Sequence, residues 1–595
     1  GHRCERSAGG GRGATAAELD GPLATLPEDQ KLGDLRLTPP ALRALGARPA
    51  TDGTSLVEVT FAADPRLGRS ASLDTDDGPL ALRDDGAGGD AKAGDGIFTA
   101  AVATPYATLV DRQRAVLTEL RRREIVATTI FDGPAVVGRA AIDFSALAAG
   151  TPARISFFDP PVPAFAAART LTITDLGVVE DPTRTFNPCT SAGTPMGAWT
   201  FGALATAIVN PAVTGLDPSD VVMDWLQTWN TTPVINTFGV SARHGIDDVI
   251  AGWPKLPSGK LDLARAPLRL LAIVNRADLA GNPSYGHVGG AEGRFVFSVL
   301  HPDCKPRAFT VILEYGVPRR TCGALRDWAA AWIALDGMTP GTSAYNDALA
   351  ALTAQFSAAG ADPGKPAGSA LSQLRTDEND LLPHDLDQRE WELREFTLQD
   401  TAAGVRLRET TVKQTPDERF NGERGGARAP DLATWINGHQ VAVTAGRHTV
   451  PLALPFPPGD GFLGGATLNF FTFFNGTNHR DYWTAPGIAS NAARHQFSLA
   501  TCNGCHGEET RTGFLHVRDL GFGIAPSLSG FLTGADVPDP VDPATTYHYA
   551  ELASRAVRLA QLAGAQCRAR VTKDGLGFGG APLPPIGLRP RLSAH

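Results

Sequence analysis

The sequence lacks the long hydrophobic runs of a membrane-spanning protein. Its apolar stretches, such as Leu268 to Val274 and Leu468 to Phe474, have the length of strands and fall short of the roughly 20 residues that a helix needs to cross a bilayer. The sequence also lacks an excess of positive charge, since 54 Lys and Arg face 63 Asp and Glu for a formal net charge of −9. No basic face is present to attract phosphate, so we expect no nucleic-acid binding. The short apolar runs predict that no segment spans a membrane.

Several familiar site motifs are also missing. The chain has no Gly-x-Ser-x-Gly turn, no His-Glu-x-x-His pair, no Walker loop and no Rossmann glycine pattern, which removes the common hydrolase, zinc-protease and nucleotide-binding signatures. Methionine is scarce: the chain has 3, and the last of them is Met338.

One short segment stands out, Cys502-Asn503-Gly504-Cys505-His506. It fits the Cys-x-x-Cys-His pattern that holds a c-type haem covalently. In that chemistry the two thiols add to the vinyl groups, and the histidine binds the iron as its proximal ligand. With 7 cysteines and 13 histidines in 595 residues, chance produces the pattern in about one of 500 such chains. We therefore predict one covalent haem c, held by Cys502, Cys505 and His506.

Two other uses of these residues stay open. The thiols and His506 are three potential zinc ligands, which His516 would complete. Alternatively, the two thiols form a disulfide. A thioredoxin-like redox pair is disfavoured because no βαβ pattern surrounds the motif.

The sequence does not decide the second axial ligand of the iron. A methionine after the motif is excluded, because the last is Met338. We expect His516 first, because the ten residues after His506 can span about 33 Å when extended. The other candidates are His479, His495, His548 and an open or water-bound iron. A histidine pair would lower the potential and block small ligands, whereas an open site would permit peroxide or oxygen chemistry.

Arginines near the motif are candidate partners of the haem propionates. Arg494, Arg511 and Arg518 can offer forked hydrogen bonds to a carboxylate, and of these we select Arg494 and Arg518. The alternative is that they are solvated surface residues.

The segment 497–516 resembles the haem-binding end of exported bacterial monohaem, cytochrome-like proteins. The matching residues are Phe497-Ser498-Leu499-Ala500-Thr501 before the motif, and Glu509-Thr510 and Phe514-Leu515-His516 after it. The resemblance implies a covalent haem and an extracytoplasmic location, whether periplasmic, cell-surface or secreted. The chain departs from compact cytochrome c because it has no late methionine, and no activity is implied.

The region from about 50 to 145 is β-rich. Leu56 to Phe61 alternates with period two, as do Ile97 to Val102 and the stretch around Ile125 to Phe131. Their spacing predicts an immunoglobulin-like sandwich. Arg83 to Phe98 resembles the acidic turn of bacterial extracellular Ig-like modules, which implies a spacer or contact surface.

The acidic turns of this region are a candidate calcium site, because calcium prefers oxygen-rich loops. The EF-hand spacing is absent, and the alternative is that Asp and Gly simply form turns. The residues concerned are Asp74, Asp76, Asp77, Asp84, Asp85, Asp90 and Asp95.

In the middle of the chain, strands and helices come in blocks, which predicts an α+β fold with a mixed or antiparallel sheet. We expect helices over 197–208, 220–229, 322–335, 343–359 and 549–562, and strands over 268–275, 294–300, 309–315, 392–399 and 405–412. Charges at strand ends, in 275–278, in 292–294 and at Glu314, could line a cleft or form a buried ion-pair network.

The whole chain is predicted to be multidomain. It divides into a tail or linker (1–45), an all-β Ig-like sandwich (46–145), a linker (146–185), the α+β domain (186–445) and a mainly helical and loop haem domain (446–595).

Five further cysteines lie outside the motif. We prefer a Cys304–Cys322 disulfide, worth about 3 kcal/mol through its loop, with Cys189 and Cys567 pairing at long range and Cys4 left over. The first residue is not methionine, which we interpret as a mature exported chain.

These observations favour an exported monohaem c-type cytochrome in electron transfer or haem-based redox chemistry. Its partner would be a redox protein or a neighbouring subunit. Two alternatives stay open. One is a cell-surface structural or self-assembling homo-oligomer with a secondary haem, and the other is a peroxidase-like haem enzyme.

Overall fold

The computed structural model describes residues 26–27, 42–50, 54–61, 70–75, 78–90, 92–94, 97–103, 155–156, 165–280, 291–319, 322–382, 389–444, 446, 448–454, 461–471, 481–564 and 567–568. The chain forms two compact units. Of the described residues, those between 42 and 156 belong to one unit and those between 165 and 567 to the other. The chain is a mixed α+β protein with antiparallel sheets, as predicted. Within the described ranges, no helix has the length and apolar character that crossing a bilayer requires.

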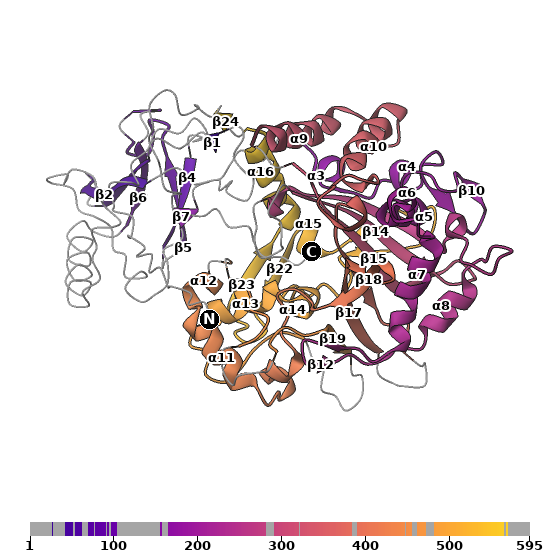
Figure 1. Cartoon of the computed structure of the whole chain (residues 1–595). Coiled ribbons are helices and arrows are strands. Elements are labelled where there is room, and N and C mark those ends of the chain that lie inside the picture. Colours follow the sequence, from indigo (N-terminus) through magenta and orange to yellow (C-terminus); the bar gives the residue numbers. More distant parts are fainter. Residues whose placement is uncertain are drawn as a thin grey trace, which may run out of the picture. The chain divides into compact units, whose positions relative to one another are not determined.

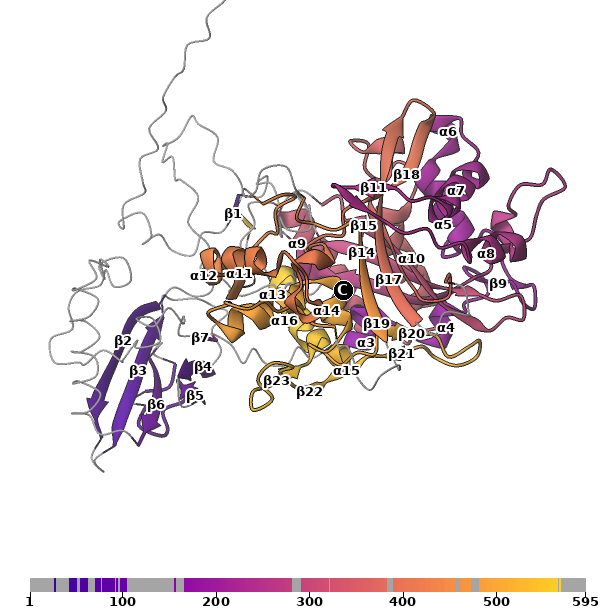
Figure 2. The ribbon, with the colours of Figure 1, turned by 90° about the horizontal axis from the view of Figure 1, so that it is seen from below.

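The first unit contains a six-stranded antiparallel sheet in the order β2-β3-β6-β5-β4-β7 (Figure 2). Its strands are β2 Leu42–Pro49, β3 Ser55–Phe61, β4 Ser70–Thr75, β5 Gly78–Arg83, β6 Ile97–Val102 and β7 Ile155–Ser156. Val57, Val59 and Phe98 are buried. The strands expected over 56–61 and 97–102 are confirmed, whereas the one around 125–131 lies outside the described residues.

The second unit is built on an eight-stranded antiparallel sheet (Figure 1). Seven strands follow the order β18-β17-β16-β15-β14-β13-β8, and β19 pairs with β17. The strands are β8 Thr172–Ile173, β13 Leu268–Arg276, β14 Glu292–Leu300, β15 Pro306–Gly316, β16 Leu371–Glu378, β17 Arg389–Thr401, β18 Gly404–Thr410 and β19 Ala466–Phe471. β19 comes from the stretch expected to form a separate haem domain, and its pairing with β17 joins that stretch to the central sheet.

One face of this sheet, which we call the aromatic face, packs against helices. Alternate residues of a strand point to the same face of a sheet, so Phe295 and Phe297 of β14 share this face with the residues paired with them on neighbouring strands. Helices α5 Phe201–Val209, α7 Pro218–Gln227 and α10 Ser343–Ser357 supply its partners. Phe201 lies 5.9 Å from Phe297, Phe356 lies 6.1 Å from Phe295, and Trp225 lies 6.1 Å from Phe396, as ring centroids.

The opposite face, which we call the charged face, carries the alternate residues of the same strands. Arg294 pairs across the strands with Glu314, and Arg375 pairs with Ile312 and Glu395. The ionisable residues buried on it include Arg269, Arg276, Glu292, Arg294, Glu314, Arg375, Asp377 and Glu395. The charges at the strand ends therefore form the buried ion-pair network that the sequence left as one of two alternatives.

The C-terminal part of the second unit covers the charged face. Val517 packs with Val274, Val296 and Ile312, and Arg269 forms an ion pair with Asp519. The elements are α13 Asn491–Ala500, α14 Cys502–His506, β20 Val517–Arg518, β21 Ser527–Leu528, α15 Gly530–Thr533, β22 Ala535–Pro538, β23 Thr546–Tyr549 and α16 Glu551–Ala563. Figure 2 shows α13, α14 and α16 grouped beside the sheet.

The remaining helices and strands of this unit are short or peripheral. α7 begins after Asp217, whose side chain accepts a hydrogen bond from Ser219 N at 3.0 Å, with Pro218 at the first helical position. The others are α3 Ala167–Thr170, α4 Leu176–Val179, β9 Phe186–Asn187, β10 Ala192–Gly193, α6 Pro211–Thr214, β11 Val234–Ile235, β12 Phe238–Gly239, α8 Ile246–Gly252, α9 Cys322–Ala334, α11 Ala429–Gly438 and α12 Gln440–Thr444.

The predicted disulfide Cys304–Cys322 is wrong, because Cys304 is bonded to Cys189, with their Cα atoms 5.9 Å apart. The suggested Cys189–Cys567 pair is wrong for the same reason. Cys304 precedes β15 and Cys322 follows it. An extended strand of that length holds its ends about 35 Å apart, whereas a disulfide requires Cα atoms within about 7 Å. Cys4 lies outside the described residues.

Candidate functional site

The Cys-x-x-Cys-His motif forms the one-turn helix α14, which is fixed at several points. Thr501 caps it and accepts a hydrogen bond from Gly504 N at 3.1 Å. Cys502 N donates to Thr415 Oγ1 at 2.9 Å, and Trp483 Nε1 donates to Asn503 Oδ1 at 2.7 Å. All five residues of the helix are buried, so the motif has a defined position against the rest of the unit.

The position of Gly504 inside the motif requires glycine for a steric reason. A Cβ atom at Gly504 would lie 2.1 Å from the carbonyl oxygen of Ser498 and 2.7 Å from Thr501 Oγ1. Gly507 is similar, because a Cβ atom there would lie 2.2 Å from the carbonyl oxygen of Asp481. Both glycines therefore allow α14 to pack closely against the preceding chain.

The two cysteines of the motif are thiols and are not bonded to each other. The Cys502 side chain packs among Trp391, Leu393, Val412 and Phe514. Burial raises the pKa of Cys502 to about 11, and burial together with the Glu551 carboxylate raises the pKa of Cys505. The thiols are thus reduced, neutral and shielded from water in the folded chain.

His506 is held in one tautomer. Its Nδ1 donates a hydrogen bond to the carbonyl oxygen of Phe514, which can only accept. Nε2 is then the nitrogen that carries the lone pair in the neutral ring, as a metal ligand requires. Burial lowers the pKa of His506 to about 4, so the ring is neutral at pH 7. Asp377 Oδ2 also lies near Nδ1, at 3.7 Å.

Phe514 presents its carbonyl from a rare backbone conformation. Its φ of 81° lies in the left-handed region, which costs energy for a residue with a side chain. Its ring stacks on Trp391, with centroids 4.6 Å apart, and its N–H donates to His506 O at 3.1 Å. These contacts offset the strain and keep the carbonyl on His506.

The structure places His516 next to the motif, and its role as the second ligand of the iron stays a prediction. Its Nδ1 lies 2.9 Å from Ser529 Oγ and its Nε2 lies 3.6 Å from Cys505 Sγ. The ring centroids of His506 and His516 are 4.5 Å apart. Two imidazoles on opposite sides of one metal, at about 2.0 Å each, would have ring centres about 6 Å apart. The rings as they stand are too close for that arrangement by more than 1 Å.

A cavity adjoins the two histidines. Its volume is about 50 Å³ and it is partly open to solvent, so it has room for a few water-sized groups. The sheet supplies Thr172, Val274, Arg294 and Asp377 among its walls, and α16 supplies Arg555. The cavity is thus bounded by the motif on one side and by the charged face on another.

The motif supplies the side chains that attach a c-type haem, namely two unoxidised thiols three residues apart on one helix and a neutral histidine whose lone pair is on Nε2. The small cavity and the fully buried thiols leave no room for a porphyrin in the folded chain, so the segments around the motif would have to move to admit one. The zinc alternative has no comparable support. Within the described ranges, the group of three possible ligands whose atoms lie within 4.8 Å of one another is His495, Glu509 and Asp539, outside the motif.

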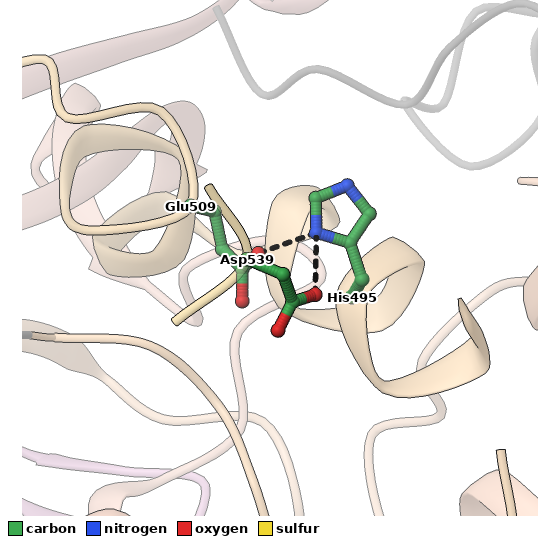
Figure 3. A group of neighbouring side chains, drawn as sticks. All are labelled: His495, Glu509 and Asp539. Atoms are coloured by element: carbon green, nitrogen blue, oxygen red, sulfur yellow. Dashed lines mark hydrogen bonds and ion pairs between the residues drawn. The ribbon is translucent and has the colours of Figure 1, made fainter. Parts of the chain in front are cut away.

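That second group is drawn in Figure 3. His495 Nδ1 lies 2.5 Å from Glu509 Oε2 and 3.8 Å from Asp539 Oδ2. Arg494 forms ion pairs with both carboxylates, at 2.8 Å to Asp539. Because the Arg494 guanidinium already pairs with both carboxylates, we interpret the group as an ion-pair cluster.

The other predicted site residues lie away from the cavity walls. Arg494, expected at a propionate, is engaged in the cluster just described, and Arg518 is exposed on β20. His548 is exposed and forms an ion pair with Asp536 at 2.7 Å. His479 lies outside the described residues. The propionate roles of Arg494 and Arg518 stay predictions.

Sequence reasoning missed the sheet's contribution to the cavity. Thr172, Arg294 and Asp377 lie 125 to 330 residues before the motif, and Arg555 lies 49 residues after it. A signal was present, because charged residues stand two positions apart in otherwise apolar strands, as Glu292 and Arg294 do. Such alternation indicates that one face of a buried strand is polar.

The acidic turns of the first unit use their carboxylates on the backbone. Asp84 Oδ1 accepts from Gly94 N at 2.5 Å, Asp90 Oδ2 from Gly86 N at 2.6 Å, and Asp85 Oδ1 from Ala87 N at 3.0 Å. Asp76, Asp77 and Asp95 lie outside the described residues. The calcium site stays a prediction.

No family model, curated protein or solved structure matches this chain. The interpretation of the site therefore depends on its own residues: the motif, the tautomer of His506 and the adjoining cavity.

Proposed function

We propose that this protein is an extracytoplasmic monohaem c-type protein that transfers electrons. The observation that carries the proposal is the Cys-x-x-Cys-His motif on a buried helix whose histidine turns Nδ1 toward a backbone carbonyl. The Cys189–Cys304 disulfide is compatible with an oxidising compartment. For the first unit we propose an Ig-like module that serves as a spacer or contact surface.

Each residue of the site has a definite part in this proposal. Cys502 and Cys505 hold the haem covalently, and His506 binds its iron through Nε2. The bound haem supplies a one-electron redox couple. Phe514 keeps the imidazole oriented, and Trp391 and Phe514 exclude water from the thioether side.

A second candidate is haem chemistry on a small ligand, as in a peroxidase. It is favoured by the spacing of His506 and His516, whose ring centroids at 4.5 Å are too close for both to bind one iron from opposite sides. If the two rings do not separate when haem is bound, the second axial position is open.

Visible spectra of the purified chain, produced in a host that attaches c-type haem, test both candidates. We expect one haem that stays with the chain on a denaturing gel. It should be lost in Cys502→Ser/Cys505→Ser and kept in the control Cys189→Ser/Cys304→Ser. Colourless wild-type protein from such a host would contradict the proposal. A spectral shift with carbon monoxide would favour the second candidate, and no shift would favour electron transfer with His516 as ligand.

A further inference from the structure

The floor of the cavity contains a row of three neighbouring residues on three strands. Val274 on β13 pairs with Thr172 on β8 and, on its other side, with Arg294 on β14. All three line the cavity. Thr172 and Arg294 therefore share one face of the sheet, about 10 Å apart at the backbone with Val274 between them.

Both polar members of this row have an unused hydrogen-bonding atom. Arg294 donates through Nε to Glu292 and lies with Nη1 3.0 Å from Glu314. Its Nη2 is buried and has no partner, and the same holds for Thr172 Oγ1. The two residues are only 3% and 2% exposed. A buried donor without an acceptor costs about 1–3 kcal/mol, so a cavity that retains two of them is suited to a ligand with acceptor atoms.

The charge around this end of the cavity favours an anion. Arg555 of α16 lines the cavity opposite the sheet. Burial, His506 and the arginines Arg555, Arg276 and Arg294 lower the pKa of His516, and burial and Arg276 lower the pKa of Arg555 to about 10. Among the ionisable side chains that line the cavity, Arg294 and Arg555 are cations, and burial raises the pKa of Asp377 well above its usual value. A carboxylate matches the forked geometry of arginine.

We propose that this cavity binds a carboxylate group, which accepts hydrogen bonds from Arg294 Nη2 and Thr172 Oγ1. The carboxylate has two possible sources. One is a propionate of the attached haem, and this source rests on the proposed function. The other is a small free carboxylate that enters beside the haem.

The first experiment uses the full chain produced without haem attachment, with sodium acetate as the probe in a calorimetric titration. We expect saturable binding that weakens at least tenfold in Thr172→Val and in Arg294→Lys. Thr172→Val removes a hydroxyl without a partner, so it should not lower the thermal stability of the ligand-free chain. Arg294→Lys keeps a cation between Glu292 and Glu314 but has no Nη2. Arg518→Gln, an exposed arginine outside the cavity, is the control and should bind as the wild type does.

The second experiment repeats the titration on the haem-loaded chain and adds the midpoint potential. If a propionate occupies the site, acetate no longer binds, and both variants lower the potential, because a less neutralised propionate favours oxidised iron. If a free carboxylate occupies it, acetate still binds and the variants again weaken it at least tenfold. Either result supports the proposal.

The proposal is overturned if the unloaded chain binds no acetate, or binds it equally in all variants, while the potential of the loaded chain is unchanged in both. A chain that never takes up haem but binds acetate in the expected way would refute the proposed function and leave the carboxylate site standing.

Discussion

The two faces of the eight-stranded sheet bury their side chains by different means over most of their area, although the aromatic face also holds buried ion pairs at its β16–β18 end, such as Arg394 with Glu409 at 3.3 Å. On the aromatic face, rings from α5, α7 and α10 meet rings from the strands at centroid distances near 6 Å. On the charged face, buried ion pairs such as Arg276 with Asp278 at 2.8 Å and Arg375 with Glu395 at 3.1 Å lie under the C-terminal segment.

The difference matters for how each face contributes to the fold. Aromatic burial stabilises in proportion to area and shape. Buried ion pairs recover little net energy, because desolvation opposes their attraction, and yet removing one partner is costly. The aromatic face therefore supplies stability, whereas the charged face gives one fixed arrangement of polar groups beside the motif.

The largest expected effect comes from breaking one ion pair. Arg276 is fully buried and donates to both oxygens of Asp278 at 3.0 and 3.1 Å. Arg276→Met leaves Asp278 as an unpaired buried charge and should lower the free energy of unfolding by about 3–5 kcal/mol in denaturant titrations. Arg276→Met/Asp278→Leu should recover a large part of the loss.

Phe396→Ala on the aromatic face is the matched comparison, with a similar loss of about 3–5 kcal/mol. No change in charge should recover it. If the double variant of the charged face were no more stable than Arg276→Met, the distinction between the faces would be unfounded.

An intermediate effect is expected from pH. Glu409 sits at the β18 end of the aromatic face, 3.3 Å from Arg394. Burial raises its pKa to about 7, which Arg394 partly opposes. Between about pH 4.5 and 7 the native state holds a proton that the unfolded chain has released, so stability falls as pH rises through this window.

Glu409→Gln should reduce this loss of stability with rising pH. The variant should match the wild type at pH 4 and exceed it by about 2 kcal/mol at pH 8, measured as the free energy of unfolding across the range. Equal slopes for both proteins would show that Glu409 does not titrate in this window.

The smallest effect is expected at Asp377, on the charged face. Burial and Glu378 raise the pKa of Asp377 well above its usual value, which favours the neutral carboxyl group in the folded chain. Asp377→Asn should change the free energy of unfolding at pH 7 by less than about 1 kcal/mol. A loss as large as that of Arg276→Met would mean that Asp377 is ionised in the folded chain.

The elements of the second unit were largely predictable from local pattern. The strands expected over 268–275, 294–300 and 309–315 correspond to β13, β14 and β15, and the helices expected over 322–335 and 343–359 correspond to α9 and α10. Strand alternation and helical spacing are patterns within a single element, so they can be recognised without knowing how the rest of the chain folds.

What depends on distant residues was not predictable. The motif singled out Cys502, Cys505 and His506 as haem-binding residues and His516 as the second ligand; these roles stay predictions, although the structure places His516 beside the motif. The partner of Cys304 was missed because Cys189 lies 115 residues earlier, and pairing cannot be deduced from cysteine positions alone. The cavity was missed because the sequence does not show the order of the strands, which places β8 and β14 on either side of β13, nor the position of α16 beside them.

The burial of α14 also bears on how the protein matures. Both thiols have no exposed surface, and burial raises the pKa of Cys502 to about 11, so few of the nucleophilic thiolates exist once the chain is folded. If the proposed haem is attached, the attachment has to take place before the C-terminal segment docks on the sheet. Docking would then limit the time available for maturation, because a chain that folds first closes the motif to haem until it unfolds again.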